Sequence, residues 1–144
     1  MIGLTWMNRD DLQSLAQIRL DEAKILLDSR MYNGAYYLCG YVVECALKAC
    51  IAKNTHEYDF PPDRRTIDAI YSHKLEGLLK AAGLEVQFNN DKKIDEELKL
   101  LWQIVSTWTE SSRYEKWSEQ KARDLYDAIT DPSHGVLQWI TKYW

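Results

Sequence analysis

Four polar or aromatic side chains recur at helical spacing inside the most apolar stretch of the chain, residues 34–53 (GAYYLCGYVVECALKACIAK). At about 100° per residue, a helix places Tyr37, Tyr41, Glu44 and Lys48 within about 60° of one another. The other side of that helix carries small or apolar residues: Ala35, Cys39, Val42, Val43, Ala46, Ala49 and Cys50. A polar stripe among apolar neighbours is either a satisfied structural network or the wall of a ligand groove.

Glu44 is expected to be mostly buried, and a buried charge must be paired. Arg19 lies within the apolar face of the preceding predicted helix, which should pack antiparallel against residues 34–53 because the connection is short. We therefore predict a structural Arg19–Glu44 ion pair. Lys48, one turn after Glu44 in the favourable order, is the second candidate, with local helix support as its alternative role.

Three more residues could contribute to a groove. His73 precedes a short predicted helix, where it is expected to be exposed or to cap the helix, with a role as groove ligand as the alternative. Arg113 and Tyr114 lie in an irregular polar segment, residues 109–117 (TESSRYEKW). A planar cation beside an aromatic ring suits a phosphate and a base, and packing of the helix connection is the alternative. The binding candidates are therefore Tyr37, Tyr41, Glu44, Lys48, His73, Arg113 and Tyr114.

The motifs and the composition exclude several other functions. The chain has no phosphate-cradling glycine loop, no HExxH and no nucleophile elbow, so we predict no cofactor, no metal and no catalytic residue of those classes. The net charge of −4 argues against strong nonspecific binding of nucleic acid. With 144 residues, the chain is predicted to form a single domain, 1–144, with its own core.

All three cysteines fall in the apolar stretch. Cys39 and Cys50 share a face about three turns apart, too far for a disulfide, and Cys45 points elsewhere. We expect buried free thiols in a reducing cytosol, and hence a cytoplasmic protein. The first residues show no secretory signal, and the internal glutamate and lysine favour a buried helix over a membrane span.

Helical periodicity dominates the whole chain and predicts an all-α fold. Asn8 is expected to cap a first helix that runs to about Arg30, and Asn33-Gly34 is expected to form the turn before the second helix, which ends near Lys53. The predicted N-caps of the later helices are all serines: Ser72, Ser118 and Ser133.

The remaining connections are placed by their turn residues. Residues 54–71 are expected to be a loop with a short helical turn near its end, and Gly83 is expected to stop the third helix. A linker containing Asn89-Asn90 should lead to a fourth helix over about 91–107, and Asp131-Pro132 should interrupt the last helical region.

The order of these segments resembles the HEPN domain family. Residues 34–52 are similar to the signature helix of the family, 19–27 (RLDEAKILL) to its first helix and 72–79 (SHKLEGLL) to its third. Trp108 followed by residues 112–114 (SRY) resembles the Arg-Tyr segment that follows the fourth helix of the family. The resemblance implies an up-and-down bundle of four or five helices, usually a homodimer.

The family has two functional branches. The metal-independent ribonucleases carry an arginine, then four to six residues, then a histidine. The other branch lacks this motif and typically serves as the partner subunit of a small nucleotidyltransferase encoded beside it. In this chain His73 follows Arg65 with seven residues between them, and His134 follows Arg123 with ten. The positions where a histidine should follow Arg113 hold serine, glutamate and glutamine.

The resemblance and the missing motif together favour a noncatalytic HEPN subunit that binds a minimal nucleotidyltransferase, with a nucleotide or substrate in the polar groove as a further expectation. We expect the isolated protein not to cleave RNA. The alternative is a divergent, toxin-type ribonuclease using Arg113 with His73 or another atypical base. The aromatic C-terminal segment, residues 137–144 (LQWITKYW), is the expected surface of a homodimer.

Overall fold

The structure is a computed structural model that describes residues 7–55, 64, 67–68 and 71–144. Over these residues every regular element is helical, which confirms the predicted all-α fold. The described elements are α1 (Arg9–Asp28), α2 (Tyr32–Lys53), α4 (Leu75–Ala81), α5 (Glu85–Ile94), α6 (Glu96–Ser106), the 3-10 helix η2 (Glu110–Tyr114), α7 (Glu119–Thr130) and α8 (Val136–Thr141).

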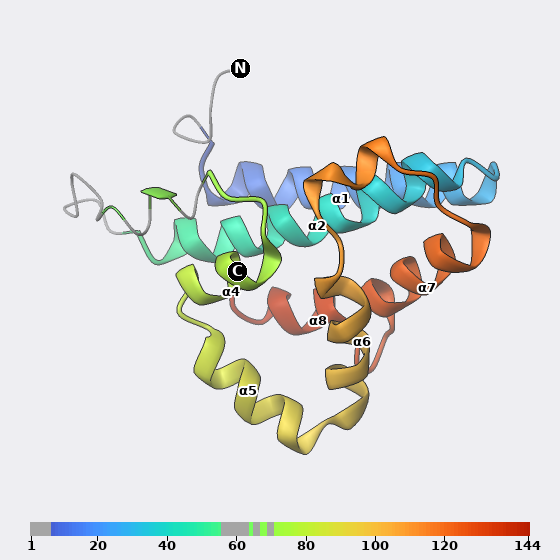
Figure 1. Ribbon diagram of the computed structural model, residues 1–144. Helices are drawn as coiled ribbons and strands as arrows, with labels where there is room; N and C mark the ends of the chain where they lie inside the picture. The colour runs from blue at the N-terminus through green and yellow to red at the C-terminus, as the bar shows by residue number, and fades with distance from the viewer. Residues whose placement is uncertain (1–6, 56–63, 65–66, 69–70) are drawn as a thin grey trace.

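The first two helices form an antiparallel pair along one side of the molecule (Figure 1). Asn8 caps α1 as predicted, since its side chain accepts a hydrogen bond from the Asp11 N–H (2.8 Å) and the Asp11 carboxylate accepts one from the Asn8 N–H (3.1 Å). The chain reverses at Arg30, which adopts a left-handed conformation with φ 63°. This tight reversal makes the two helices neighbours along their whole length.

The predicted turn at Asn33-Gly34 is wrong, because α2 already begins at Tyr32 and includes both residues. The Asn33 side chain instead accepts a hydrogen bond from the Trp117 N–H (2.6 Å), across the molecule. Gly34 lets α1 approach closely, since a Cβ there would lie 3.1 Å from a Leu26 methyl carbon. Gly34 therefore serves the close packing of α1 against α2, and it does not form a turn.

Helix α2 is the core of the fold, and 14 of its 22 residues are buried. It contacts α1, α4, α7, α8 and η2, so every described helix except α5 and α6 packs directly and extensively against it. By length and composition α2 could cross a membrane, but most of it is buried inside the molecule, as in the core helix of a soluble protein. The length and apolar composition of α2 are therefore only weak evidence for a membrane span.

The fourth predicted helix is divided in two. Residues 91–107 do not form one helix, because Asp95 takes an extended conformation between α5 and α6 and its side chain caps α6 at the Leu98 N–H (3.1 Å). Asn89-Asn90 lies inside α5 and not in a linker. Burial of Phe88 between Trp102 and Trp139 explains this, since it anchors a helix whose polar residues give no strong helical signal.

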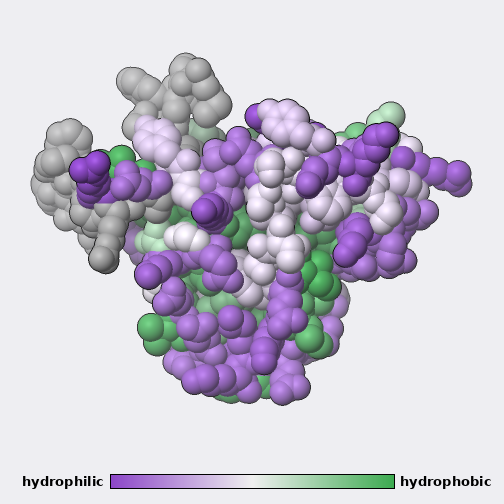
Figure 2. All heavy atoms as spheres, viewed as in Figure 1, coloured by the Kyte–Doolittle hydropathy of each residue, from purple (hydrophilic) through white to green (hydrophobic). Residues whose placement is uncertain are grey.

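Helices α5 and α6 form the end of the molecule opposite the α1–α2 pair (Figure 1). The visible surface of this end is mainly hydrophilic, with isolated hydrophobic residues (Figure 2). Gly83, with φ 74°, ends the α4 region as predicted. The N-cap of α4 is Lys74, however, and not Ser72 as predicted. The Ser72 hydroxyl instead accepts a hydrogen bond from the Lys74 N–H (3.2 Å), in the turn before the helix.

The last two helices follow the predicted break. Ser118 caps α7 by accepting a hydrogen bond from the Lys121 N–H (3.2 Å), as predicted. The restart at Ser133 is wrong, because α8 begins only after Gly135. The Asp131 carboxylate accepts hydrogen bonds from the Ser133 and His134 N–H groups (3.1 and 2.7 Å), which holds these residues in a turn.

The C-terminal aromatic residues are not an exposed cluster. Trp139 is buried against Phe88 and Tyr143, and its indole N–H donates to the Asp91 carboxylate (2.8 Å). Tyr143 and Trp144 are partly buried. The premise of the predicted dimer surface is therefore wrong, since the α5 helix that the sequence did not predict covers Trp139.

Candidate functional site

Glu44 is the centre of a buried polar network on α2. Its side chain is only 2% exposed, and both carboxylate oxygens have partners. The Lys48 ammonium donates to Oε2 (3.1 Å), and His73 Nδ1 lies 2.9 Å from Oε1. Lys48 is itself 6% exposed. The predictions that Glu44 is buried and paired with a cation are therefore confirmed.

The predicted Arg19–Glu44 ion pair does not form. Arg19 pairs with Glu22, one turn further along its own helix and partly exposed to solvent. The reason is that Lys48 and His73 already occupy both oxygens of Glu44, while Glu22 offers Arg19 a partner without taking either charge out of water.

His73 connects the buried network to the surface. Its Nε2 lies 3.3 Å from Oε2 of Glu110, the first residue of η2, while its Nδ1 faces Glu44. Each ring nitrogen of His73 therefore faces a carboxylate oxygen, and an ionised carboxylate can only accept hydrogen bonds. His73 does not cap α4, whose N-cap is Lys74, and it is held in this network by Glu44 and Glu110.

The η2 segment places Arg113 and Tyr114 at the outer edge of the network. Both are exposed, and the guanidinium carbon of Arg113 lies 4.7 Å from the centre of the Tyr114 ring. The Tyr114 side chain raises the pKa of Arg113 above its ordinary value, and the fields of Tyr37 and Glu110 raise it further. Arg113 therefore stays charged at any relevant pH and lies near the same carboxylate that faces His73.

A stacked tryptophan holds η2 against α2. The Trp117 ring lies 3.8 Å from that of Tyr36 with 11° between the planes, and its indole N–H donates to the Ser112 carbonyl (2.9 Å). Thr109 and Ser112 form a capping box at the start of η2. These contacts give the polar 109–117 segment a defined position, which the sequence alone described only as irregular.

Tyr37 and Tyr41 line the half-buried part of the stripe, with their ring centres 6.2 Å apart. Tyr37 also lies 5.9 Å from the ring of Trp108. Burial raises the pKa of Tyr41 to about 12, so its hydroxyl remains a neutral hydrogen-bonding group. The two rings offer apolar faces beside the charged network, and Tyr37 lies within the field of Arg113.

Two features of the site were missed by sequence reasoning. Glu110 pairs with His73, and the available signal was an acidic residue three positions before Arg113 in the polar segment. Gly40 makes room for Trp108, because a Cβ at Gly40 would lie 2.1 Å from the indole ring. Within the described part of the chain, the buried indole N–H of Trp108 has no hydrogen-bond partner.

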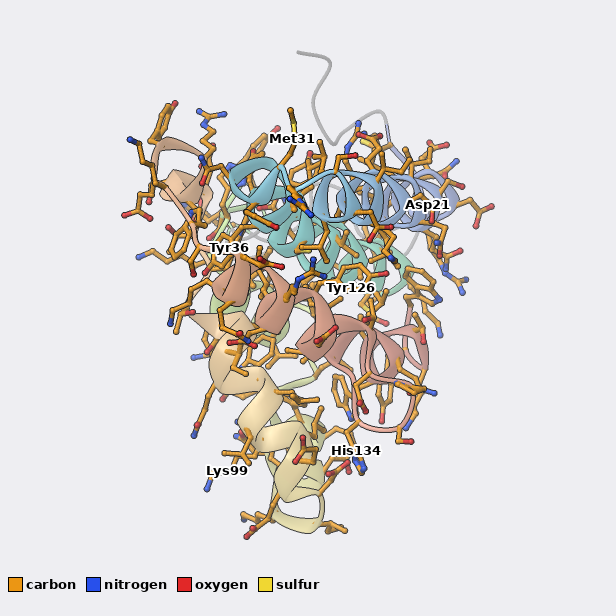
Figure 3. The ribbon with its side chains drawn as sticks, turned by 90° about the vertical axis from the view of Figure 1, so that its right-hand side faces the viewer. Asp21, Met31, Tyr36, Lys99, Tyr126 and His134 are labelled. Carbon is orange, nitrogen blue, oxygen red and sulfur yellow. The ribbon has the colours of Figure 1, made fainter. Side chains whose placement is uncertain are left out.

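The other potential reactive groups lie elsewhere. His134 pairs with Asp95 (2.8 Å) at the end of the molecule far from α1 (Figure 3), and His56 lies outside the described residues. Burial raises the pKa of each cysteine thiol to about 12, which leaves them protonated and unreactive. Among residues 7–55, 64, 67–68 and 71–144, no group of His, Cys, Asp and Glu has the arrangement of a metal site.

The comparisons with known proteins identify the family. No curated protein and no solved structure matches this chain. The model of the HEPN domain matches residues 10–142, which include α1 except for its first residue, the whole of α2, the Glu44–His73–Glu110 network and the η2 segment. The chain therefore belongs to the HEPN domain family.

Proposed function

We propose that this protein is a noncatalytic HEPN subunit that acts in the cytoplasm by binding a small nucleotidyltransferase. The observation that carries the proposal is the position of His73, which faces two carboxylates and not an arginine. The expected ribonuclease spacing of arginine and histidine is also missing from the sequence.

The chemistry of RNA cleavage explains why this position matters. A base must take the proton of the 2′-hydroxyl while a cation offsets the charge that develops on the phosphate. In this site a phosphate approaching Nε2 of His73 meets the carboxylate of Glu110 first. Arg113 adds an exposed positive charge on the neighbouring η2, and Tyr37 and Glu110 both raise its pKa. We infer that this surface holds a nucleotide or another anion without breaking it.

An apolar surface on α1 is the best candidate for protein binding. Ile18, Ile25 and Met31 are all exposed along α1 and its following turn, and Met31 points away from the body of the molecule (Figure 3). Exposed apolar residues gathered on one element are typical of a contact surface. We propose that this surface contacts either the nucleotidyltransferase or a second copy of the chain.

Co-purification tests the partner assignment. The small nucleotidyltransferase expected in a neighbouring reading frame is tagged and expressed with wild type or with Ile25→Asp. The control is Val86→Asp, which adds the same charge at an exposed apolar residue on α5. We expect wild type and the control to be retained and Ile25→Asp to be lost. Retention of all three forms would place the partner elsewhere, and light scattering of each form alone separates this contact from homodimerisation.

The alternative function is a divergent ribonuclease, and one observation favours it. The buried Glu44 orients a half-exposed His73 (2.9 Å), as a buried carboxylate orients the histidine of a catalytic dyad, with Arg113 nearby. Nuclease-free protein is incubated with structured and single-stranded RNA beside His73→Ala and Arg113→Ala. We expect no cleavage by any of the three. Cleavage by wild type that both variants lose would establish the ribonuclease, whereas cleavage that survives both substitutions indicates contamination.

A further inference from the structure

A separate cavity lies between the beginning of α1 and the end of α2. Its volume is about 420 Å³, within the usual range for small-molecule pockets. Leu12, Ile51 and Ala52 provide apolar walls. The cavity is away from η2 and its exposed Arg113, because the C-terminal end of α2 meets the N-terminal end of α1 (Figure 1), whereas η2 packs near the beginning of α2.

Among the residues that the structure describes, the titratable ones that line this cavity are the two cations Lys48 and Arg9. Arg9 is fixed at the rim, where its Nη2 donates to the main-chain oxygen of Trp144 (2.6 Å). The described wall of the cavity is therefore apolar and positively charged.

Lys48 is the decisive residue, because it is buried and yet incompletely paired. An ammonium group has three N–H donors, and the hydrogen bonds of the described residues account for one of them, to Glu44. Glu44 in turn shares its single negative charge with His73. Because Glu44 binds both Lys48 and His73, the remaining N–H donors of Lys48 are available to a second anion inside the cavity.

We propose that this cavity binds a small organic anion, with its apolar body against Leu12, Ile51 and Ala52 and its acidic group at Lys48. This cavity lies on the other side of Glu44 from His73, and the two sites are connected because Lys48 and His73 both contact Glu44. An anion at Lys48 competes with the Glu44 carboxylate for the same ammonium. The ligand class is therefore a carboxylate, sulfonate or phosphate that carries a compact apolar group.

A matched pair of probes tests the charge requirement. The probes are 8-anilinonaphthalene-1-sulfonate and its uncharged analogue N-phenyl-1-naphthylamine, and binding is followed by fluorescence titration of the full chain. We expect the sulfonate to bind at a single site, with an affinity about tenfold or more above that of the uncharged probe. A ratio of dissociation constants of this size is typical of one hydrogen bond to a charged group. Equal binding of the two probes, or no binding of the sulfonate, would overturn the proposal.

Three variants locate the site. Lys48→Met should weaken sulfonate binding about tenfold while leaving the uncharged probe unaffected. Glu44→Gln should strengthen sulfonate binding, because it removes the competing carboxylate. Lys121→Met should change nothing, because it removes an exposed lysine in the first turn of α7, which follows Trp117 at the beginning of α2, and the cavity lies at the other end of α2. Equal sulfonate affinity in Lys48→Met and Lys121→Met would show that Lys48 does not bind the anion.

A cavity-filling variant keeps the test independent of the buried charges. Ala52 is partly exposed and lines the cavity, so Ala52→Phe should fill it from the rim without removing a charge. We expect this variant to bind neither probe, with an unchanged circular dichroism spectrum. Undiminished sulfonate binding by folded Ala52→Phe would place the probe on another surface, such as the exposed apolar residues of α1, and would refute the site even if Lys48→Met failed to fold.

Discussion

In the described part of the chain, His73 and His134 each contact a carboxylate at nearly the same distance, but in opposite settings. His73 lies 2.9 Å from Glu44 in the α2 network, and His134 lies 2.8 Å from Asp95 at the α5–α6 junction. The histidines are exposed to a similar degree, but Glu44 is 2% exposed and Asp95 is 31% exposed. The two pairs therefore differ in the burial of the carboxylate, and this burial determines how much each pair contributes to the stability of the fold.

A buried carboxylate requires all its partners, because water cannot replace them. Glu44 binds Lys48 as well as His73, and Lys48 is buried too. Asp95 is partly hydrated and has a second role, because it caps α6 through the Leu98 N–H. The Glu44 pair is consequently part of the core, while the Asp95 pair is a surface contact between two turns. Four substitutions test this contrast, in order of expected effect.

Glu44→Ala should give the largest effect. It leaves the buried Lys48 ammonium without its carboxylate and removes one of two acceptors of His73, at a cost on the order of 3–5 kcal/mol in the free energy of unfolding. Thermal and urea unfolding of the variant measure this cost. A melting temperature equal to that of wild type would mean that the α2 network is solvated and that the contrast between the two pairs does not exist.

Gly40→Ala tests the packing beside the same network. The added Cβ would lie 2.1 Å from the Trp108 ring, which must move, and overpacking of this kind costs about 1–3 kcal/mol. The tryptophan near-ultraviolet circular dichroism signal should change together with stability. Gly77→Ala is the matched control, because nothing closer than 3.9 Å surrounds a Cβ at that exposed helical position. Equal stability of the two variants would contradict the close Gly40–Trp108 contact.

Asp95→Ala should have a smaller effect than Glu44→Ala. It removes the N-cap of α6, for a loss of about 1 kcal/mol in unfolding free energy. Asp95→Asn separates the two roles of the residue, since asparagine also caps helices but carries no charge for His134. Urea unfolding should therefore find Asp95→Asn close to wild type. If Asp95→Asn is as unstable as Asp95→Ala, the ion pair and not the cap is the stabilising contact.

The pH dependence of the Asp95–His134 pair should be the smallest effect. The hydrogen bond between them raises the pKa of His134 above its ordinary 6.5 and lowers the pKa of Asp95 below its ordinary 3.8. The His134 contribution is complete below pH 6.5 and is lost as pH rises through the raised pKa, while the Asp95 contribution is present above pH 3.8 and is lost as pH falls through the lowered pKa.

The stabilising window of this pair therefore spans the mildly acidic range between the two ordinary pKa values. The difference in melting temperature between wild type and His134→Gln should be greatest at about pH 5 and should decrease towards about pH 8. Because both side chains are largely solvated, the difference should be small at any pH. A difference that grows as pH rises to alkaline values would contradict the raised pKa of His134.

Sequence periodicity and capping residues predicted much of the fold because they act locally. The spacing of apolar residues identified α2 and its polar stripe, Asn8 and Ser118 marked two helix starts, and Gly83 marked a helix end. Helix α5, which the sequence analysis missed, depends instead on contacts with distant residues. Its polar residues carry no periodic signal, and it exists because Phe88 is buried against aromatic rings from α6 and α8.

The sequence by itself determined that Glu44 must be buried and paired, since an acidic residue inside the most apolar helix has no alternative. The sequence also offered Lys48, one turn away, as a partner, but only the tertiary structure decided the distant one. His73 is 29 residues away along the chain, and Glu110 reaches the same histidine from η2. Arg19 was an equally good partner by residue type, but selection among distant cations depends on how α4 and η2 pack against α2. That packing is set by shape and burial, which periodicity along one helix does not contain.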